Sequence, residues 1–230
     1  MNTTTTKKRP VGRPRADGKA PLSREAVFAV AAKLIATHGY VGTSLRMIAE
    51  PLDARAPSIS RMFGSKRHLL IELVKSLSLP SIRYHEQLAQ MSLPPAPRLF
   101  KMVHGEVMAV ASTNESLMAI FYLPELRQRE FREALAVRQQ MIGYYRSTII
   151  DGIEQGVFHN VNPSSTAEQV FQVTETAIIA TDRSTLGTPQ LLADNTADLV
   201  LRGLLKRPES LEEIASTSQQ LRLNTGMRTD

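Results

Sequence analysis

Apolar residues recur at spacings of three and four along most of the chain, which is the period of amphipathic helices. The first such segment follows Ser23, a favourable helix N-cap, and stops at Gly39, a residue type that commonly ends helices. Thr43 or Ser44 is placed to cap a short second helix that ends at Pro51. These signals predict that short helices begin the folded part of the chain.

Prolines and polar caps mark the remaining helices. A third short helix opens at Pro57, and a fourth is capped by Ser65 and expected to end near Pro80. Further helices are expected over 97–113, in a shorter piece ending before Pro124, over 131–153, and after the pairs Asn162-Pro163 and Thr188-Pro189. No segment shows the alternation of a strand, so the pattern predicts an all-α chain of about nine helices.

Charge is distributed unevenly between the two parts of the chain. Residues 1–75 hold 14 Lys and Arg against 5 Asp and Glu, a net charge of +9, whereas the remainder holds 14 against 17, a net charge of −3. A basic segment on a slightly acidic body is typical of a domain that meets phosphates. A solvated basic face without a partner is the alternative.

Composition removes several classes of protein. The chain has no cysteine, which excludes disulfides, thiolate metal sites and a cysteine nucleophile. Its five histidines lack metal-ligand spacing, and no nucleophile with a base or phosphate loop is recognisable, so neither an enzyme nor a metal or other cofactor is expected. No apolar run is long enough for a membrane span and no signal-peptide pattern opens the chain, so a cytoplasmic location is expected.

The short helices of residues 43–63 have the outline of a helix-turn-helix. Two short helices joined by a tight connection and buttressed by a preceding helix are what this motif needs. The second helix, Ala56 to Met62, carries small or polar outward positions and one arginine, Arg61. A thin helix of this kind fits the major groove, where an arginine can pair with guanine through two hydrogen bonds. An ordinary three-helix packing unit would have the same outline.

The same region resembles the TetR family of bacterial repressors. The resemblance rests on the pattern Val27-x-x-x-Ala31-x-x-Leu34-Ile35-x-x-x-Gly39-Tyr40-x-x-Thr43-Ser44-x-x-x-Ile48-Ala49, continued by Ile59-x-x-x-Phe63-x-Ser65-Lys66-x-x-Leu69-Leu70. Further along, Gly152–Phe158 is similar to the loop before the family's two dimerisation helices. The resemblance implies a homodimer with a ligand-binding helical body, which releases operator DNA when ligand binds.

The resemblance also implies roles for positions in the head. Thr43 and Ser44 would cap the second helix and touch phosphate, and Lys66 would lie on the DNA backbone. Three residues differ from the family pattern: Asp53 stands at a turn glycine, Arg55 at a capping serine, and Ser60 at a groove-facing tyrosine. The candidate DNA-binding residues are Arg13, Arg15, Thr43, Ser44, Arg55, Ala56, Pro57, Ser58, Ser60, Arg61, Met62 and Lys66.

An N-terminal arm precedes the head. Gly12-Arg13-Pro14-Arg15 resembles an AT-hook core, an extended strand thin enough for a narrow, A·T-rich minor groove. A merely basic tail that adds non-specific affinity is the alternative. The expected parts of the chain are a disordered basic arm (1–20), the helix-turn-helix head (21–66), a ligand-binding and dimerisation body (67–207) and a flexible tail (208–230).

The body offers candidates for a small-molecule pocket. They are large apolar groups with a few polar ends, and Gly105 leaves space in the middle of a helix. Plain core packing is the alternative for each, and an apolar or aromatic compound is the expected effector. The candidate ligand-binding residues are His104, Met108, Phe121, Tyr122, Met141, Tyr144, Tyr145 and Glu175.

Small and branched residues alternate on the last two long helices, as in a four-helix seam between two copies of a chain. Packing within their own domain is the alternative. The residues concerned are Ala167, Val170, Phe171, Thr174, Ala177, Ile178, Thr181, Leu192, Thr196, Leu199, Val200, Gly203 and Leu204.

Together these features predict a homodimeric transcriptional repressor of palindromic double-stranded DNA, released by an unidentified small-molecule effector. Activation stays open, because the sign of regulation depends on where the operator lies. An architectural protein of AT-rich DNA without an effector is the alternative function.

Overall fold

The computed structural model describes residues 22–175, 183–208 and 211–220. Its helices are α1 (Arg24–Gly42), α2 (Leu45–Ala49), α3 (Ala56–Phe63), α4 (Lys66–Gln90), α5 (Pro95–Ser112), α6 (Glu115–Met118), α7 (Arg132–Glu154), α8 (Pro163–Thr174), α10 (Pro189–Leu204) and α11 (Leu211–Gln220). Short 3-10 turns are η1 (Glu50–Leu52), η2 (Ala119–Tyr122), η3 (Pro124–Arg127), η4 (Arg129–Phe131) and η5 (Arg183–Leu186). The prediction of an all-α fold is confirmed: in the described part, β pairing is confined to one isolated bridge between Phe158 and Leu205.

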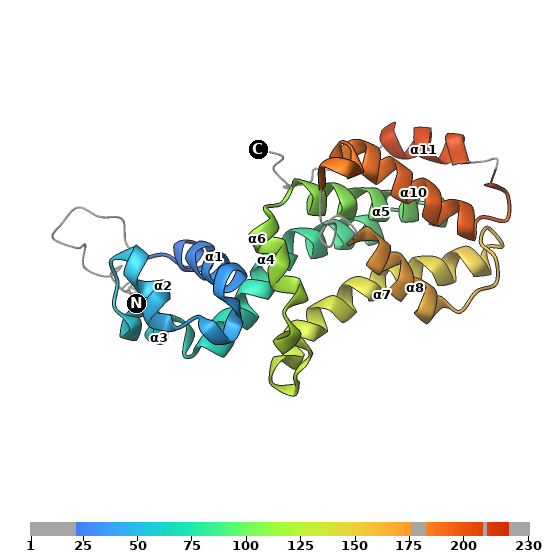
Figure 1. Ribbon diagram of the computed structural model, residues 1–230. Coiled ribbons are helices and arrows are strands. Elements are labelled where there is room, and N and C mark those ends of the chain that lie inside the picture. Colours follow the sequence, from blue (N-terminus) through green and yellow to red (C-terminus); the bar gives the residue numbers. More distant parts are fainter. Residues whose placement is uncertain (1–21, 176–182, 209–210, 221–230) are drawn as a thin grey trace, which may run out of the picture.

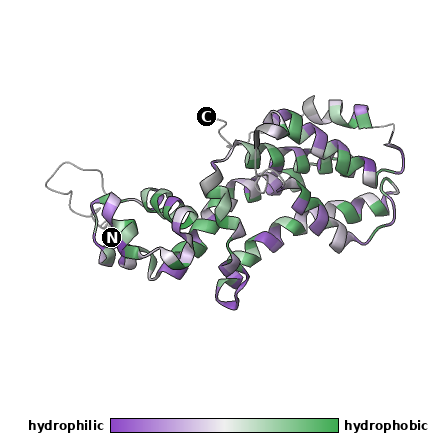
Figure 2. Cartoon of the chain, in the orientation of Figure 1, coloured by the Kyte–Doolittle hydropathy of each residue, from purple (hydrophilic) through white to green (hydrophobic). Residues whose placement is uncertain are grey.

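The helices form a small head and a larger body (Figure 1). α1, α2 and α3 make the head, and the long α4 runs from it into the body, where α5 lies among α4, α7, α8, α10 and α11. Hydrophobic and hydrophilic stretches alternate along most of the helices (Figure 2), as the spacing of apolar residues predicts. Within the described residues, no helix is both long enough and apolar enough to cross a membrane.

Three helices of the head region begin where the sequence places their serine caps, whereas α1 continues past the expected end at Gly39. The hydroxyl oxygens of Ser23, Ser44 and Ser65 each accept a hydrogen bond from a backbone N–H three residues ahead. Gly39, at φ 71°, interrupts the helical backbone of α1, which resumes for a last turn to Gly42. The confirmed caps satisfy backbone donors that water would otherwise have to reach.

Two clusters of buried side chains form the interior. The head core includes Val27, Ile35, Ile48, Ile59, Phe63, Leu69 and Leu73, and extends to Ile120, Leu126, Phe131 and Ala134. The body core includes Tyr84, Leu99, Met102, Tyr145, Phe158, Ala197 and Leu201. Because residues 120–134 complete the head core, the head does not stand apart from the body.

Arg24 fastens the beginning of α1 to the end of α3 and to α4. Its guanidinium lies 4.4 Å from the centre of the Phe63 ring, donates to the carbonyl of Met62 at 3.4 Å, and pairs with Glu72 at 3.1 Å. These contacts fix α3 against the two longer helices.

Two expectations about helix ends are wrong. α4 does not end near Pro80 but continues to Gln90, because Pro80 is on the exposed side while Tyr84, His85 and Leu88 beyond it are buried. Core packing thus outweighs the roughly 3 kcal/mol that an interior proline costs a helix. The expected tail after residue 207 contains α11, whose Leu211 is buried in the body core next to α5.

Candidate DNA-binding head and ligand cavity

The structure presents α3 on the outside of the head. Ile59 and Phe63 are buried beneath it, whereas Pro57 and Arg61 are exposed. Arg55, also exposed, is the N-cap residue but makes no side-chain cap hydrogen bond. The remaining candidates on this helix are half-buried: Ala56, Ser58, Ser60 and Met62.

The turn before α3 contains a residue in the left-handed region. Asp53 has φ 48° and ψ 40°, and it is the one described non-glycine residue with positive φ. Aspartate is among the few residues that adopt this conformation readily. The replacement of a turn glycine by Asp53 therefore leaves the helix-turn-helix geometry intact.

Thr43 and Ser44, both predicted to touch phosphate, have different surroundings. Ser44 is exposed and is the N-cap of α2. Thr43 is 1 % exposed, and its hydroxyl donates to the carbonyl of Gly39 at 2.8 Å. Thr43 thus closes the end of α1, and Ser44 is the one of the two that faces solvent.

Lys66 is bound within the head. Its Nζ donates to the carbonyl oxygens of Tyr40, at 2.8 Å, and Thr43, at 2.7 Å, and lies 4.3 Å from the centre of the Tyr40 ring. Burial lowers the pKa of Lys66. The amine therefore ties the start of α4 to the end of α1, a role that the sequence did not reveal. Arg13 and Arg15 of the expected arm lie outside the described residues.

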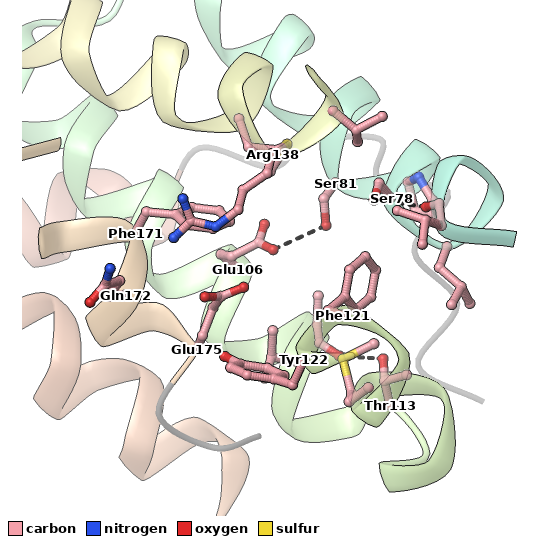
Figure 3. Close-up of a pocket in the computed structure, with 18 of the residues that line it drawn as sticks. Ser78, Ser81, Glu106, Thr113, Phe121, Tyr122, Arg138, Phe171, Gln172 and Glu175 are labelled. Carbon is pink, nitrogen blue, oxygen red and sulfur yellow. Dashed lines mark hydrogen bonds between the residues drawn. The ribbon is translucent and has the colours of Figure 1, made fainter. Parts of the chain in front are cut away.

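The body contains a partly open cavity of about 930 Å³ between α4, α5, α7, α8 and the η2–η3 segment. Figure 3 shows polar side chains from several of these elements pointing toward a common space. Six of the candidate ligand-binding residues line it: His104, Met108, Phe121, Tyr122, Met141 and Glu175.

Tyr144 and Tyr145 do not line this cavity. Tyr145 is fully buried in the body core, and its hydroxyl donates to the carbonyl of Met102 at 3.3 Å. Tyr144 stacks on the ring of His85 at 5.7 Å, and its hydroxyl donates to Glu86 at 3.4 Å. The surroundings of these two residues fit the alternative of plain packing.

Sequence reasoning missed several polar and aromatic residues of the wall. Glu106, Arg138, Phe171 and Gln172 all line the cavity. Glu106 could have been found, since it is a charged residue on the apolar face of its helix, between Val103 and Val107. Phe171 was assigned to the dimer seam instead, and Arg138 and Gln172 are unremarkable by type and spacing.

The charged side chains of Glu106, Arg138 and Glu175 gather at one end of the cavity, whereas Ser78 and Thr113 lie apart from them (Figure 3). Arg138 pairs with Glu168 at 2.6 Å, and its guanidinium lies 5.0 Å from the centre of the Phe171 ring. Glu106, 7 % exposed, accepts a hydrogen bond from Ser81 Oγ at 3.3 Å, and its other oxygen lies 3.3 Å from His85 Nε2.

Glu175 is the second carboxylate at this end. It is hydrogen-bonded to the hydroxyl of Tyr122. Burial raises the pKa of Glu175 to about 7, and the opposing effect of Arg138 does not cancel this. Glu106 raises it further, so the two carboxylates feel each other's charge.

His104 and Gly105 both line the cavity, and both also contact neighbouring helices of the body. Nε2 of His104 lies 2.9 Å from the amide nitrogen of Gln190 and 3.2 Å from Asp194 Oδ1, and burial lowers its pKa. The space left by Gly105 is taken by the ring of Tyr84, which lies 2.5 Å from where a Cβ would be. Gly105 therefore allows α4 to pack closely against α5.

Most of the residues expected in a dimer seam are buried within the chain itself. Val170, Phe171, Val200 and Leu204 belong to the body core, as the alternative interpretation holds. Leu199 is 65 % exposed on α10. Leu191, which the sequence analysis did not single out, is 51 % exposed on the same helix. Ala177, Ile178 and Thr181 lie outside the described residues.

Comparison with known proteins places the head in a sequence family. A family model described as bacterial regulatory proteins, tetR family, matches residues 27–73. The transcriptional regulator BetI of Agrobacterium fabrum is 31 % identical over 124 residues, which are 52 % of this chain and 59 % of that protein's length.

Solved structures extend the likeness to the body. AmtR of Mycobacterium smegmatis has a TM-score of 0.66 and 26 % identity, and the match covers 91 % of this chain and 99 % of that one. AibR, whose structure is a complex with isovaleryl coenzyme A and operator DNA, has a TM-score of 0.64 and 17 % identity, covering 76 % and 96 %. At this identity, the likeness to AibR is one of fold.

Proposed function

We propose that this chain, whose residues 27–73 match the model of the TetR family of bacterial regulatory proteins, is a DNA-binding transcriptional regulator of that family that leaves its operator when a small molecule fills the body cavity. Its partners are then double-stranded palindromic DNA, a second copy of the chain and an effector. As a regulator of bacterial genes, it acts in the cytoplasm.

The exposed side of α3 is the observation that carries the proposal. A short helix held by buried Ile59 and Phe63 offers Arg61 and a thin outer surface to a major groove. Ser44, at the start of α2, is placed to contact a DNA phosphate. Ser60, in place of a larger aromatic side chain, leaves more of the readout to Arg61.

Two exposed leucines support pairing of two copies. Leu191 and Leu199 stand eight residues apart on α10, so they lie on one side of the helix. Exposed apolar positions of this kind are covered when a second copy packs against them. Two heads about 34 Å apart would span successive turns of a palindromic operator.

Residues 119–131 supply a physical route between effector and DNA. Phe121 and Tyr122 face the cavity, Ile120 and Phe131 are buried in the head core, and Leu126 takes part in both. A ligand that moves this wall therefore also moves side chains of the head core. It can shift the equilibrium only by its difference in affinity for the two arrangements. An architectural protein without an effector would have no use for such a cavity.

Fluorescence anisotropy on DNA flanking the protein's own coding region tests this function. We expect specific binding that Arg61→Ala weakens about tenfold to a hundredfold, since a bidentate arginine–guanine contact is worth about 1–3 kcal/mol. Arg146→Ala, which removes an exposed arginine of α7 in the body, is the matched control and should bind as the wild type does. Equal affinity for this DNA and for random DNA would refute the proposal.

A further inference from the structure

We infer that the cavity binds a ligand with an apolar body and a protonated amine, the amine being held between Glu106 and Glu175. This inference rests on the proposed function for the identity of the cavity as the effector site. It also concerns binding to the free protein, which can be measured without DNA.

The charges lining the cavity carry the inference. Three carboxylates, Glu106, Glu168 and Glu175, line the cavity together with two arginines: Arg138 lies beside these carboxylates, whereas Arg127 is exposed to solvent. Arg138 already forms its ion pair with Glu168 at 2.6 Å and packs on Phe171. This pair is internally balanced, so the negative charge available to a ligand belongs to Glu106 and Glu175.

Neither of these two carboxylates is balanced by a close ion pair with lysine or arginine among the contacts described. Glu106 is held by the hydroxyl of Ser81 and the imidazole of His85, and Glu175 by the hydroxyl of Tyr122. Figure 3 shows the carboxyl groups of Glu106 and Glu175 directed at the same space, with Arg138 to one side. Two negative groups in one partly buried site repel each other, and a cation between them relieves that repulsion.

The remaining wall suits the apolar part of such a ligand. Phe121, Met118, Met141 and Phe171 line the cavity. Aromatic faces beside a cation add a favourable electrostatic contact, and thioether side chains adapt to irregular apolar shapes. The acidic end is thus one side of a partly open, mostly apolar cavity.

The same arrangement disfavours an anionic ligand. A carboxylate or phosphate at this end would meet Glu106 and Glu175 and would have to compete with Glu168 for Arg138. A coenzyme A ester, as held by AibR, is therefore not the class that these residues select.

Three probes of similar shape test the inference: phenylbutylamine, phenylbutanol and phenylbutyrate, titrated into the wild-type protein by calorimetry. We expect the amine to bind at least about tenfold more tightly than the alcohol or the acid, since a nearby opposite charge at partial burial supports such a difference. Repeating the titration in buffers of different ionisation enthalpy should also show proton release on binding at a pH near 6, as the amine displaces the proton from Glu175.

Two variants and one control make the assignment specific. Glu175→Gln should reduce the preference for the amine to less than about threefold and abolish proton release. Glu106→Gln should reduce the preference similarly, while Glu130→Gln, a change at an exposed position, should leave it unchanged. Thermal unfolding of each variant verifies that it is folded.

The outcomes separate this inference from the proposed function. Equal or tighter binding of the alcohol or the acid, or no binding of any probe below about 1 mM, would overturn the assignment of a cationic ligand. Either result would leave DNA binding through α3 intact. Amine binding by a protein that shows no specific DNA affinity would instead support this site and refute the function.

Discussion

The ring of Tyr40 meets the ring of Phe131 edge to face, with centroids 5.5 Å apart and planes at 88°. Tyr40 lies near the end of α1 in the head, while Phe131 closes the segment whose earlier residues form a wall of the ligand cavity. The pair is therefore a direct contact between the proposed DNA-binding head and the segment that lines the proposed ligand cavity. A displacement of the cavity wall can therefore reach the head through this contact.

A double-mutant cycle on this pair measures the strength of the contact. Tyr40→Leu and Phe131→Leu should each lower the free energy of unfolding, and their effects should be non-additive by about 0.5–1.5 kcal/mol, the range for aromatic pairs. Urea denaturation of the four proteins provides the values. Combining Phe131→Leu with Tyr84→Leu, in the separate body core, should give additive effects. Additivity for Tyr40 and Phe131 would show that the head and the wall are not coupled there.

Lys66 allows the two interpretations of its amine to be told apart. Because Nζ is held by the carbonyls of Tyr40 and Thr43, Lys66→Met should lower the free energy of unfolding by about 1–3 kcal/mol, whereas Lys33→Met, at an exposed position, should have little effect. The salt dependence of DNA binding should stay the same. If the slope of log affinity against log salt concentration became shallower by about 0.9 without a loss of stability, Lys66 would instead be a phosphate contact.

Gly105 and Gly143 form a matched pair of mid-helix glycines. A Cβ at Gly105 would lie 2.5 Å from the ring of Tyr84, whose hydroxyl is fixed on the carbonyl of Lys101 at 2.7 Å. Gly105→Ala should therefore cost about 1–3 kcal/mol by overpacking. Among the described residues, no atom lies within 4 Å of a Cβ at Gly143, so Gly143→Ala should stabilise the protein by up to about 1 kcal/mol. Thermal unfolding of both variants checks the contrast, and equal stabilisation by the two alanines would mean that Tyr84 yields freely.

Glu175 gives the stability of the protein a specific pH dependence. Burial raises the pKa of Glu175 from 4.5 to about 7, against the influence of Arg138 and with that of Glu106 and Glu168, so the folded state holds a proton that the unfolded chain gives up. The stability from this group is fully present below pH 4.5 and is lost as pH rises through about 7.

Glu175→Gln removes this dependence. Between about pH 5 and about pH 8, the wild type should lose up to roughly 3 kcal/mol of unfolding free energy relative to the variant. Urea denaturation at the two pH values measures the difference, with Glu130→Gln as the control. Parallel pH profiles for wild type and Glu175→Gln would mean that the carboxyl is ionised at neutral pH.

Local signals in the sequence were sufficient to predict the helix caps and the left-handed turn of the head. Ser23, Ser44 and Ser65 cap helices because a hydroxyl can reach a backbone N–H three residues away, a relationship that needs no distant partner. The left-handed turn at Asp53 is likewise a property of one residue and its neighbours. Such features can be predicted from a single chain.

The cavity depends on distant packing, which spacing does not specify. Periodicity shows that Tyr145 and Met141 lie on an apolar side of one helix. It does not show that Tyr145 is covered by Met102 whereas Met141 borders the cavity. The same limit explains Pro80, whose helix continues because Tyr84 finds a groove at Gly105. Partners across the fold decide these positions.

Hydroxyl-radical footprinting on the bound operator tests the central claim, that two copies of the chain present α3 to successive turns of one DNA face. We expect two protected patches about 34 Å apart, related by the dyad of the site. Leu199→Arg should abolish the paired pattern by disrupting the exposed side of α10, while Leu79→Arg, at an exposed position of α4, should preserve it. A single patch, or no protection at all, would contradict the account.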